Sequence, residues 1–419
     1  MLVGAPRKSV QPELVEEHIE ELGRLADTAG AETLRTLIQR IDKPNPRYYI
    51  GDGKAAELRD LIEESGATLV IFDEELSPAQ SKNLEELLKT RIMDRSELIL
   101  DIFATRARSA EAKMQVELAQ LQYMLPRLKR MWVHLSRVRG GIGMRGPGET
   151  QLETDRRMIS HRITRLKDDL EHVSQVRATQ RKSRERTFQA GLVGYTNAGK
   201  SSILRALSGA DVFIEDRLFA TLDATTRTVE LGEGYEALVT DTVGFIRKLP
   251  HHLVASFRAT LEEAQEADVL LHVIDVSHPM WEEQKEVVDE VLAGLGLRDH
   301  PTVLVFNKVD RLTHEEEADW RARVASTYTH PALFVSTVED GAIEPLRAYL
   351  RDRVQELNPE VRITLPAARG GLLAEIYREG EVLSREDTGS EIQLRARLSQ
   401  ASLGRLRRKS EIRIYGGGL

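Results

Sequence analysis

The segment that most constrains the fold of this 419-residue chain is Gly194-Tyr195-Thr196-Asn197-Ala198-Gly199-Lys200-Ser201. It follows an apolar run, residues 188–193, and begins an amphipathic stretch that ends at Leu207. A glycine-rich turn between a strand and a helix directs backbone N–H groups at an anion. In such loops the lysine reaches the β- and γ-phosphates, and the serine hydroxyl binds Mg²⁺. We therefore expect all eight residues to bind a nucleoside triphosphate, with Lys200 in a catalytic role and Ser201 as a magnesium ligand.

Composition excludes several other classes of protein. The chain is 41% hydrophobic and 30% charged, which is typical of a globular protein, and its 419 residues are enough for about two to four domains. No apolar run approaches the ~20 residues of a membrane-spanning helix, and the first residues lack the apolar core of a signal peptide. The absence of cysteine excludes disulfides and thiolate metal sites. We expect a cytoplasmic protein, and its net charge of −8 requires any nucleic-acid contact to come from local basic patches.

The first region of the chain, residues 1–103, alternates helical and strand-like runs. Helices are expected over 12–26 and 77–89, a strand over 67–73 and another short strand within 92–100. This pattern predicts a small α/β domain.

Residues 104–186 have a helical pattern instead. Apolar side chains recur at steps of four and three, as in helices that pack along a narrow seam. They are Met114, Leu118, Leu121, Leu125, Leu128, Trp132 and Leu135, followed by Ile159, Ile163, Leu166, Leu170 and Val173. We expect an antiparallel helical hairpin, with the glycine-rich loop 140–150 at its bend and a kink at Pro126.

Residues 187–357 again alternate strands and helices. The runs expected to form strands are 191–193, 237–240, 269–275, 302–306 and 332–335. The segment 226–240 contains Gly232-Glu233-Gly234 between two strand-like runs and is expected to form a hairpin. Together with the phosphate-binding loop, these elements predict a P-loop α/β domain whose sheet is mostly parallel with one antiparallel strand. Residues 358–419, with strand-like runs around a helical one, predict a small C-terminal α/β unit.

A second motif, Asp241-Thr242-Val243-Gly244, follows a predicted strand. Its aspartate can reach Mg²⁺ through a water molecule, and its glycine N–H can meet the γ-phosphate. We therefore expect these four residues to bind GTP, with Asp241 as a water-mediated metal ligand and Gly244 as a catalytic group.

Two motifs point to guanine as the base. Asn307-Lys308-Val309-Asp310 ends the strand over 302–306. The Asp310 carboxylate can accept two hydrogen bonds from guanine, whereas adenine offers neither. A site built around such bonds rejects an analogue that lacks them by about 10⁴-fold, because its polar groups are left unpaired. Ser336-Thr337 follows the next strand and is expected to meet the guanine carbonyl oxygen, although alanine is more usual than Thr337 there.

The first switch segment, Phe219-Ala220-Thr221-Leu222-Asp223, must supply a threonine hydroxyl to Mg²⁺. Thr221 is our choice and is counted as both a metal ligand and a catalytic residue, because it leaves the two later threonines, Thr225 and Thr226, to begin a strand. All five residues of this segment are expected to bind GTP.

Two positions bear on the rate of hydrolysis. Phe245 stands where several switch GTPases carry a glutamine that orients the attacking water, and phenylalanine cannot do this. Without another element to align the water, turnover would be on the order of 10⁻⁴ s⁻¹. Asn197 stands where an asparagine in several related GTPases helps to bind K⁺; the alternative is that it only shapes the loop.

Taken together, these motifs identify a resemblance to the HflX family, bacterial GTPases in the same broad group as Obg. It covers essentially the whole chain. Outside the nucleotide-binding region it rests on Arg47-Tyr48-Tyr49-Ile50-Gly51-Asp52-Gly53-Lys54, Ile71-Phe72-Asp73-Glu74-Glu75-Leu76-Ser77-Pro78, Asp94-Arg95, Asp101-Ile102-Phe103-Ala104 and the loop 140–150. Residues 219–223 match the first switch of the family, which supports Thr221, and Phe245 matches its hydrophobic residue.

The resemblance implies a GTPase that binds the large ribosomal subunit and splits stalled or idle ribosomes, with its N-terminal and helical parts on rRNA. We expect it to act as a monomer. Arginine and lysine residues near the hairpin bend are compatible with RNA contact; they are Arg127, Lys129, Arg130, Arg137, Arg139, Arg145, Arg156, Arg157, Arg162 and Arg165. A solvated helix face is the alternative interpretation of these charges. Two other functions stay open: a GTPase of ribosome assembly, and a nucleotide-gated RNA-binding module with incidental hydrolysis.

Overall fold

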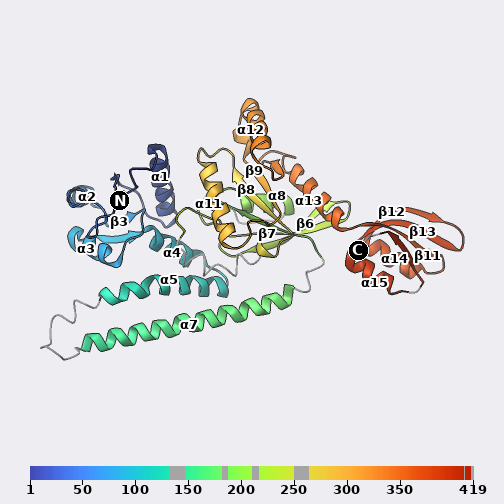
Figure 1. Ribbon diagram of the computed structural model, residues 1–419, viewed down its shortest axis with the longest axis horizontal. Helices are drawn as coiled ribbons and strands as arrows, with labels where there is room; N and C mark the ends of the chain where they lie inside the picture. The colour runs from blue at the N-terminus through green and yellow to red at the C-terminus, as the bar shows by residue number, and fades with distance from the viewer. Residues whose placement is uncertain (132–146, 182–186, 210–216, 250–263, 410, 417–419) are drawn as a thin grey trace.

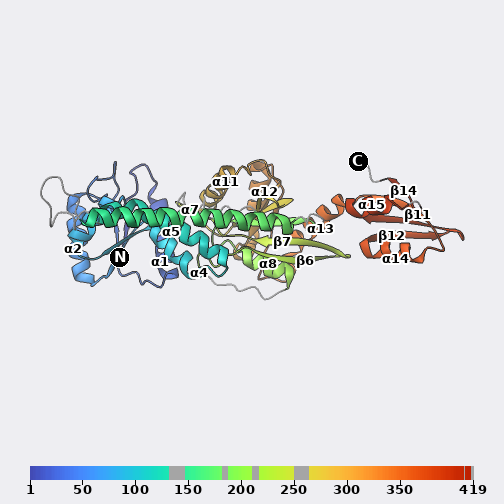
Figure 2. The ribbon, with the colours of Figure 1, turned by 90° about the horizontal axis from the view of Figure 1, so that it is seen from below.

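The computed structural model describes residues 1–131, 147–181, 187–209, 217–249, 264–409 and 411–416. Three sheets follow one another along these residues, and two long helices run beside the first two sheets (Figures 1 and 2). No helix in the described ranges has the length and apolar character needed to cross a membrane.

The N-terminal sheet has four parallel strands in the order β2-β1-β3-β4. Its elements are β1 (Leu2–Gly4), α1 (Pro12–Thr28), β2 (Thr36–Ile38), α2 (Asp52–Ser65), β3 (Leu69–Phe72), α3 (Pro78–Leu88), β4 (Arg91–Asp94) and α4 (Arg95–Arg106). The predicted small α/β domain is thus present. The short strands β1 and β2 were not predicted, because three residues are too few to show an alternating pattern.

The short strand expected within residues 92–100 is β4, which ends at Asp94. Residues 95–106 form α4, because the Asp94 side chain accepts a hydrogen bond from the Glu97 N–H and caps the helix. Such a cap satisfies a backbone donor that the first turn of a helix leaves unpaired. A short apolar run fits a buried strand and a buried helix equally well, so periodicity alone could not separate them.

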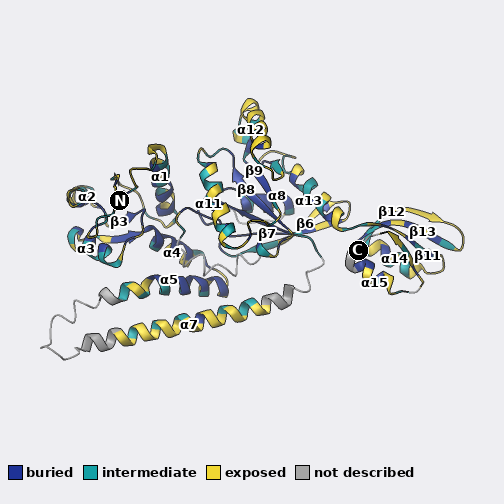
Figure 3. Ribbon diagram, viewed as in Figure 1, coloured by how far each residue is buried: buried dark blue, intermediate teal, exposed yellow. Residues whose placement is uncertain are grey.

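The helical hairpin consists of α5 (Ala110–Met131) and α7 (Pro147–Arg181), which lie antiparallel and in contact (Figure 1). Leu118 and Leu166, both predicted for the seam, are buried. The opposite face of α5 packs against α4 through Val116 and Ala119, so α5 is covered on two sides, whereas α7 is exposed over most of its length (Figure 3). α5 continues through Pro126. Trp132, Leu135 and residues 140–146 of the predicted loop lie outside the described residues.

The central sheet has six strands in the order β10-β9-β8-β5-β7-β6, and of these only β6 runs antiparallel. This confirms the predicted sheet. Its strands are β5 (Gln189–Gly194), β6 (Thr225–Gly232), β7 (Tyr235–Asp241), β8 (Val269–Asp275), β9 (Thr302–Asn307) and β10 (Ala332–Phe334). Its helices are α8 (Lys200–Ser208), α11 (Trp281–Gly294), α12 (His314–Thr327), α13 (Glu344–Leu357) and the 3₁₀ helix η1 (Val309–Arg311).

Helices cover both faces of this sheet. Successive residues of a strand point to opposite faces, so Leu192 of β5 packs with α8 and α13, whereas Val193 packs in the cluster that contains residues of α11. The seven residues of β8 are all buried. Because five of the six strands are parallel, their carboxyl ends meet at one edge of the sheet, where open α/β sheets bind their ligands.

The C-terminal sheet is antiparallel, in the order β12-β13-β11-β14. Its elements are β11 (Glu360–Pro366), α14 (Gly370–Glu379), β12 (Gly380–Asp387), β13 (Glu391–Leu398), α15 (Gln400–Arg407) and β14 (Arg413–Gly416). A C-terminal α/β unit was predicted, but with fewer elements. The hydroxyl of Tyr235 on β7 donates a hydrogen bond to Glu381 and links this unit to the central sheet. The predicted boundaries at 103, 186 and 357 stay predictions.

A buried ionic cluster joins the N-terminal sheet to residues 247 and 248. Arg95, only 1% exposed, forms ion pairs with Glu21 and with Asp73, the latter at 2.9 Å. Arg247 Nη2 lies 3.0 Å from Asp73 and Lys248 Nζ lies 2.6 Å from the same carboxylate. Burial alone would raise the pKa of Asp73, but the charges of Arg95 and Arg247 outweigh it and hold this pKa well below its usual range. We call these five residues the interdomain cluster.

Replacing Arg95 with methionine should destabilise the folded protein. Glu21 and Asp73 would each lose one of the two arginines that they share, and breaking a buried pair destabilises a protein by ~3 kcal/mol or more. Arg91→Met is the matched control, because the Arg91 side chain is 61% exposed and its ion pair with Glu97 lies at the surface, where a pair contributes below about 1 kcal/mol. Urea unfolding followed by circular dichroism should show a lower midpoint for Arg95→Met only; equal midpoints for the two variants would refute a stabilising cluster.

Candidate functional site

The loop over residues 194–201 connects β5 to α8 and can be formed only with glycine at two positions. Gly194 has φ +150°, and a Cβ there would collide with the Val273 carbonyl oxygen. Gly199 has φ +98°, and a Cβ there would collide with the Asn307 amide. L-residues with side chains rarely adopt such backbone angles. The loop is therefore pressed against the ends of β8 and β9, with the N-terminus of α8 behind it.

Lys200 lies inside this loop. Its Nζ donates to the carbonyl oxygens of Gly194 at 3.1 Å and Tyr195 at 2.7 Å. Burial lowers the pKa of Lys200 to about 8, although the Asp241 carboxylate opposes this change. A Cβ at Gly244 would lie 3.0 Å from the same Nζ. The structure thus brings together Lys200 and Gly244, two of the three predicted catalytic residues.

The three predicted metal ligands converge beside the loop. Ser201 Oγ donates to Asp241 Oδ2 at 2.6 Å, Thr221 Oγ1 donates to the same oxygen at 3.0 Å, and the two hydroxyls are 2.8 Å apart. Burial raises the pKa of Asp241, and Lys200 and the two hydroxyls oppose this change. Asp241 Oδ1 is buried without a hydrogen-bond partner among the described residues. Two hydroxyls and a carboxylate are hard oxygen donors of the kind that Mg²⁺ prefers, so the residues fit that ion.

The alternative threonines are engaged elsewhere. Thr225 Oγ1 donates to the Asp223 carbonyl, and Thr226 Oγ1 lies 2.9 Å from Thr240 Oγ1 across the β6–β7 hairpin. Within 219–226, therefore, it is the hydroxyl of Thr221 that reaches Ser201 and Asp241.

The first switch segment has two parts: residues 219–221 lie beside Lys200, and residues 222 and 223 lie away from it. Phe219, Ala220 and Thr221 line the small hollow over Lys200. Leu222 is buried, and the Asp223 carboxylate binds the start of α5, accepting hydrogen bonds from the Arg108 and Ser109 N–H groups. Both Asp223 oxygens are engaged there, so its predicted contact with GTP has no support in this arrangement.

The residues predicted to recognise guanine gather at the other end of the loop. Asn307 Nδ2 donates to the Ala198 carbonyl at 2.9 Å, and Lys308 Nζ donates to the Asn197 carbonyl at 2.9 Å. Asp310, in η1, accepts a hydrogen bond from Ser336 Oγ at 2.5 Å. The sequence motif therefore folds into one surface in which Ser336 orients the Asp310 carboxylate.

The remaining residues predicted for this site contact neighbouring strands or are buried beside the residues already described. Thr242 Oγ1 donates to the Leu192 carbonyl, Val243 and Val309 are buried, and Thr337 is half-buried beside Ser336. The loop residue Thr196 donates its N–H to the Phe245 carbonyl at 2.7 Å.

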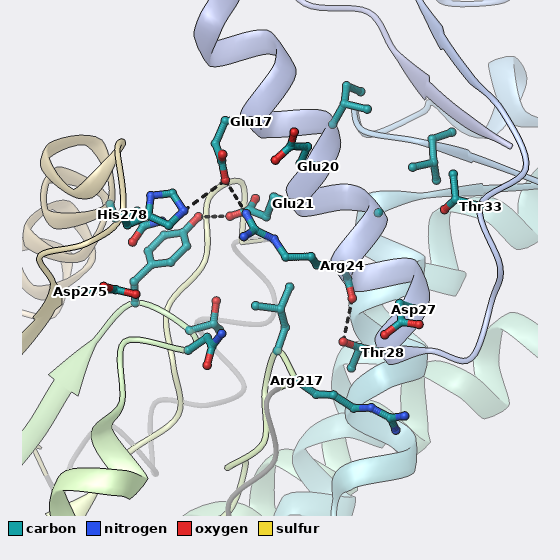
Figure 4. Close-up of a pocket in the computed structure, with 18 of the residues that line it drawn as sticks. Glu17, Glu20, Glu21, Arg24, Asp27, Thr28, Thr33, Arg217, Asp275 and His278 are labelled. Carbon is teal, nitrogen blue, oxygen red and sulfur yellow. Dashed lines mark hydrogen bonds and ion pairs between the residues drawn. The ribbon is translucent and has the colours of Figure 1, made fainter. Parts of the chain in front are cut away.

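Two hollows lie beside these residues. One, of about 50 Å³, is lined by Lys200, Ser201 and Thr221. The other, of about 1280 Å³, separates α1 from the loop and is also lined by Asn197 and Lys308. In Figure 4, Glu17 and Arg24 of α1 face the central sheet across this cavity, and Glu17 pairs with His278 at 3.2 Å. The residues predicted to bind the nucleotide thus face both their own sheet and helix α1.

Sequence reasoning missed the side-chain role of Tyr195 and the residues after Gly244. The Tyr195 hydroxyl donates to Glu21 of α1 and accepts from the Arg247 N–H at 2.8 Å. Phe245 pairs with the loop as a short parallel bridge, and its ring is buried. We call residues 241–248 the second switch segment. One signal was available: Asp73-Glu74 follows a parallel strand, where such sheets bind ligands, and the basic pair Arg247-Lys248 complements it.

Models of known families match most of the chain. Residues 16–104 match the GTP-binding GTPase N-terminal family, residues 106–184 match the GTP-binding GTPase middle region, and residues 189–308 match the family described as 50S ribosome-binding GTPase.

Individual relatives extend these matches. The GTPase HflX of Magnetococcus marinus is 43% identical over 414 residues, which cover 98% of this chain and 95% of the relative. The GTPase HflX of Caldanaerobacter subterraneus subsp. tengcongensis is 53% identical over 299 residues, 71% of this chain and 70% of the relative. Among solved structures, a GTP-binding protein of Sulfolobus solfataricus in complex with GDP aligns with a TM-score of 0.45 and 25% identity, covering 85% of this chain and all of that one. The chain therefore belongs to the HflX family of GTPases, and it binds guanine nucleotide and hydrolyses GTP.

Proposed function

We propose that this chain is a magnesium-dependent GTP switch that acts on the large ribosomal subunit in the cytoplasm, as a monomer, and splits or rescues stalled or idle ribosomes. One observation carries the proposal: both switch segments hold parts of the chain outside the central sheet. The second segment enters the interdomain cluster through Arg247 and Lys248, and the first binds α5 through Asp223. A change at the γ-phosphate would therefore reach the N-terminal sheet and the hairpin. The family that residues 189–308 match is described as 50S ribosome-binding GTPase, and for this reason we propose the large ribosomal subunit as the partner.

The proposed nucleotide site uses the residues already described. Ser201 and Thr221 would hold Mg²⁺ directly and Asp241 through water; when bound, the ion neutralises charge that develops on the phosphate oxygens. Lys200 would leave the loop carbonyls for the β- and γ-phosphates, and the Gly244 N–H would meet the γ-phosphate. Asp310 would accept the two guanine hydrogen bonds.

Turnover by the chain alone should be slow. Phe245 is buried and apolar, so it cannot orient the attacking water. A partner that reshapes the second switch segment would complete the site, and K⁺ held near Asn197 is a second means of completing it. The buried Phe245 also favours the rival function, an RNA-binding module whose hydrolysis is incidental.

The proposed RNA contact uses fewer of the basic residues than the sequence indicated, because two of them are paired within the chain. Arg127 Nη2 lies 3.1 Å from Asp94, and its guanidinium stacks on Tyr123. Arg162 pairs with Glu117 at 2.7 Å. Arg156 and Arg157 on α7 are exposed and are better placed to neutralise phosphates. Arg137, Arg139 and Arg145 lie outside the described residues, and the burial of Lys129 and Arg130 is not described.

The base-recognition role predicts a change of nucleotide preference. Asp310→Asn should weaken GTP binding by about 10³-fold or more, because one guanine donor loses its acceptor, and should improve binding of xanthosine triphosphate. Asp352→Asn, on the exposed side of α13, is the matched control and should bind GTP as the wild type does. Calorimetric titration with both nucleotides measures this change. Unchanged GTP affinity in Asp310→Asn would refute the assignment.

The ribosome proposal predicts nucleotide-dependent binding and stimulated turnover. With a non-hydrolysable GTP analogue, the protein should sediment with large subunits at modest salt, and added subunits should raise the rate of GTP hydrolysis. Arg156→Glu combined with Arg157→Glu should weaken sedimentation, whereas the same charge change at Arg321 and Arg323 on α12 should not.

Two outcomes would contradict this account. If the wild-type protein stays at the top of the gradient, the ribosome is not the partner, and sedimentation with assembly intermediates alone would favour the assembly function. If it sediments but hydrolysis is not stimulated, the RNA-binding module is the better description.

A further inference from the structure

The Asp223 carboxylate holds the first turn of α5. Its Oδ2 accepts hydrogen bonds from the Arg108 N–H at 3.1 Å and the Ser109 N–H at 3.3 Å, and its Oδ1 accepts one from the Ser109 hydroxyl. Ser109 Oγ in turn accepts a hydrogen bond from the Ala112 N–H at 3.0 Å. A chain of hydrogen bonds therefore runs from the first switch segment into the hairpin.

These contacts provide hydrogen-bond acceptors at the start of α5, where every helix has unpaired backbone N–H groups. The first N–H groups of a helix lack partners within the helix, and negative charge is favoured near them. Here Ser109 caps α5 and Asp223 holds the cap, although the two residues are 114 positions apart in the sequence. The start of α5 is thus completed by a residue of the nucleotide-binding region.

A second contact holds the chain on the N-terminal side of Thr221. Phe219 has φ +57°, an uncommon conformation for a bulky residue, and is 2% exposed. Its ring meets Phe103 of α4 edge-on, with centroids 4.6 Å apart. Such backbone angles persist only where the surroundings hold them. Phe219 and Asp223, each two residues from Thr221, are therefore both held by the junction between α4 and α5.

We propose that Asp223 is a positioning residue for GTP hydrolysis: by binding the start of α5, it sets where the Thr221 hydroxyl stands beside Ser201 and Asp241. The inference rests on the metal-binding role proposed for Thr221. It assigns to Asp223 a function other than contact with GTP. Because coupling between two sites is reciprocal, a partner that moves the hairpin also changes the metal site.

Kinetics of three variants test the proposal. Asp223→Ala should lower kcat about tenfold, which corresponds to ~1.4 kcal/mol of activation free energy, and leave the Kd for GDP within about twofold, because switch contacts are released after hydrolysis. Asp223→Asn should restore most of the turnover, since asparagine accepts the same N–H groups at helix starts. Ser109→Ala, altered only on the hairpin side, should also lower kcat. Thermal unfolding of each variant shows whether it is folded.

The outcomes separate this proposal from the one on which it rests. Wild-type turnover in Asp223→Ala overturns the coupling. Equal loss in Asp223→Asn and Asp223→Ala also overturns it, since the charge and not the hydrogen-bonded cap would then matter. If Thr221→Ala is slow while Asp223→Ala is not, only the coupling fails. If Thr221→Ala keeps wild-type turnover, the metal role of Thr221 fails and the coupling fails with it. A change in melting temperature without a change in kcat would show a purely structural cap.

Discussion

The interdomain cluster is the interaction on which the arrangement of this protein depends. Removing charges from water is costly, and they are tolerated in an interior only when their geometry satisfies one another. Arg95 lies between Glu21 and Asp73, and Arg247 of the second switch segment meets the same two carboxylates. Moving Arg247 away would leave buried charge with fewer partners. The position of the residues after Gly244 is therefore tied to the N-terminal sheet.

The nucleotide site is consequently shared among three parts of the chain. The central sheet supplies the loop, Asp241 and the residues proposed to recognise guanine. The N-terminal region reaches the loop through the hydrogen bond from Tyr195 to Glu21 of α1, and the helical region holds the first switch segment through Asp223. A switch works when two states differ in contacts that a ligand can bias. Here those contacts are hydrogen bonds and ion pairs at the two switch segments, which join the central sheet to the N-terminal and helical regions.

Local motifs made much of this site predictable. The motifs that contain Lys200, Ser201 and Asp241 indicated a shared site, because both motifs lie at the carboxyl ends of strands in one parallel sheet. The partners of Asp223 and Tyr195 could not be predicted, since they lie more than 100 positions away and no periodicity relates them. For Arg247 and Asp73, complementary charge was the one available signal. The boundary between β4 and α4 was missed because an apolar run suits either element, and it was decided by the cap at Asp94.

The central claim is that the switch segments transmit the nucleotide state to the N-terminal and helical regions. Amide hydrogen exchange of the full chain, with GDP and with a non-hydrolysable GTP analogue, tests it most directly, because exchange reports local opening of hydrogen-bonded turns. Residues 108–112, at the start of α5, should change protection together with residues 219–223, whereas α2 should not respond. If residues 219–223 respond to the nucleotide and residues 108–112 exchange identically in both states, the claim is wrong.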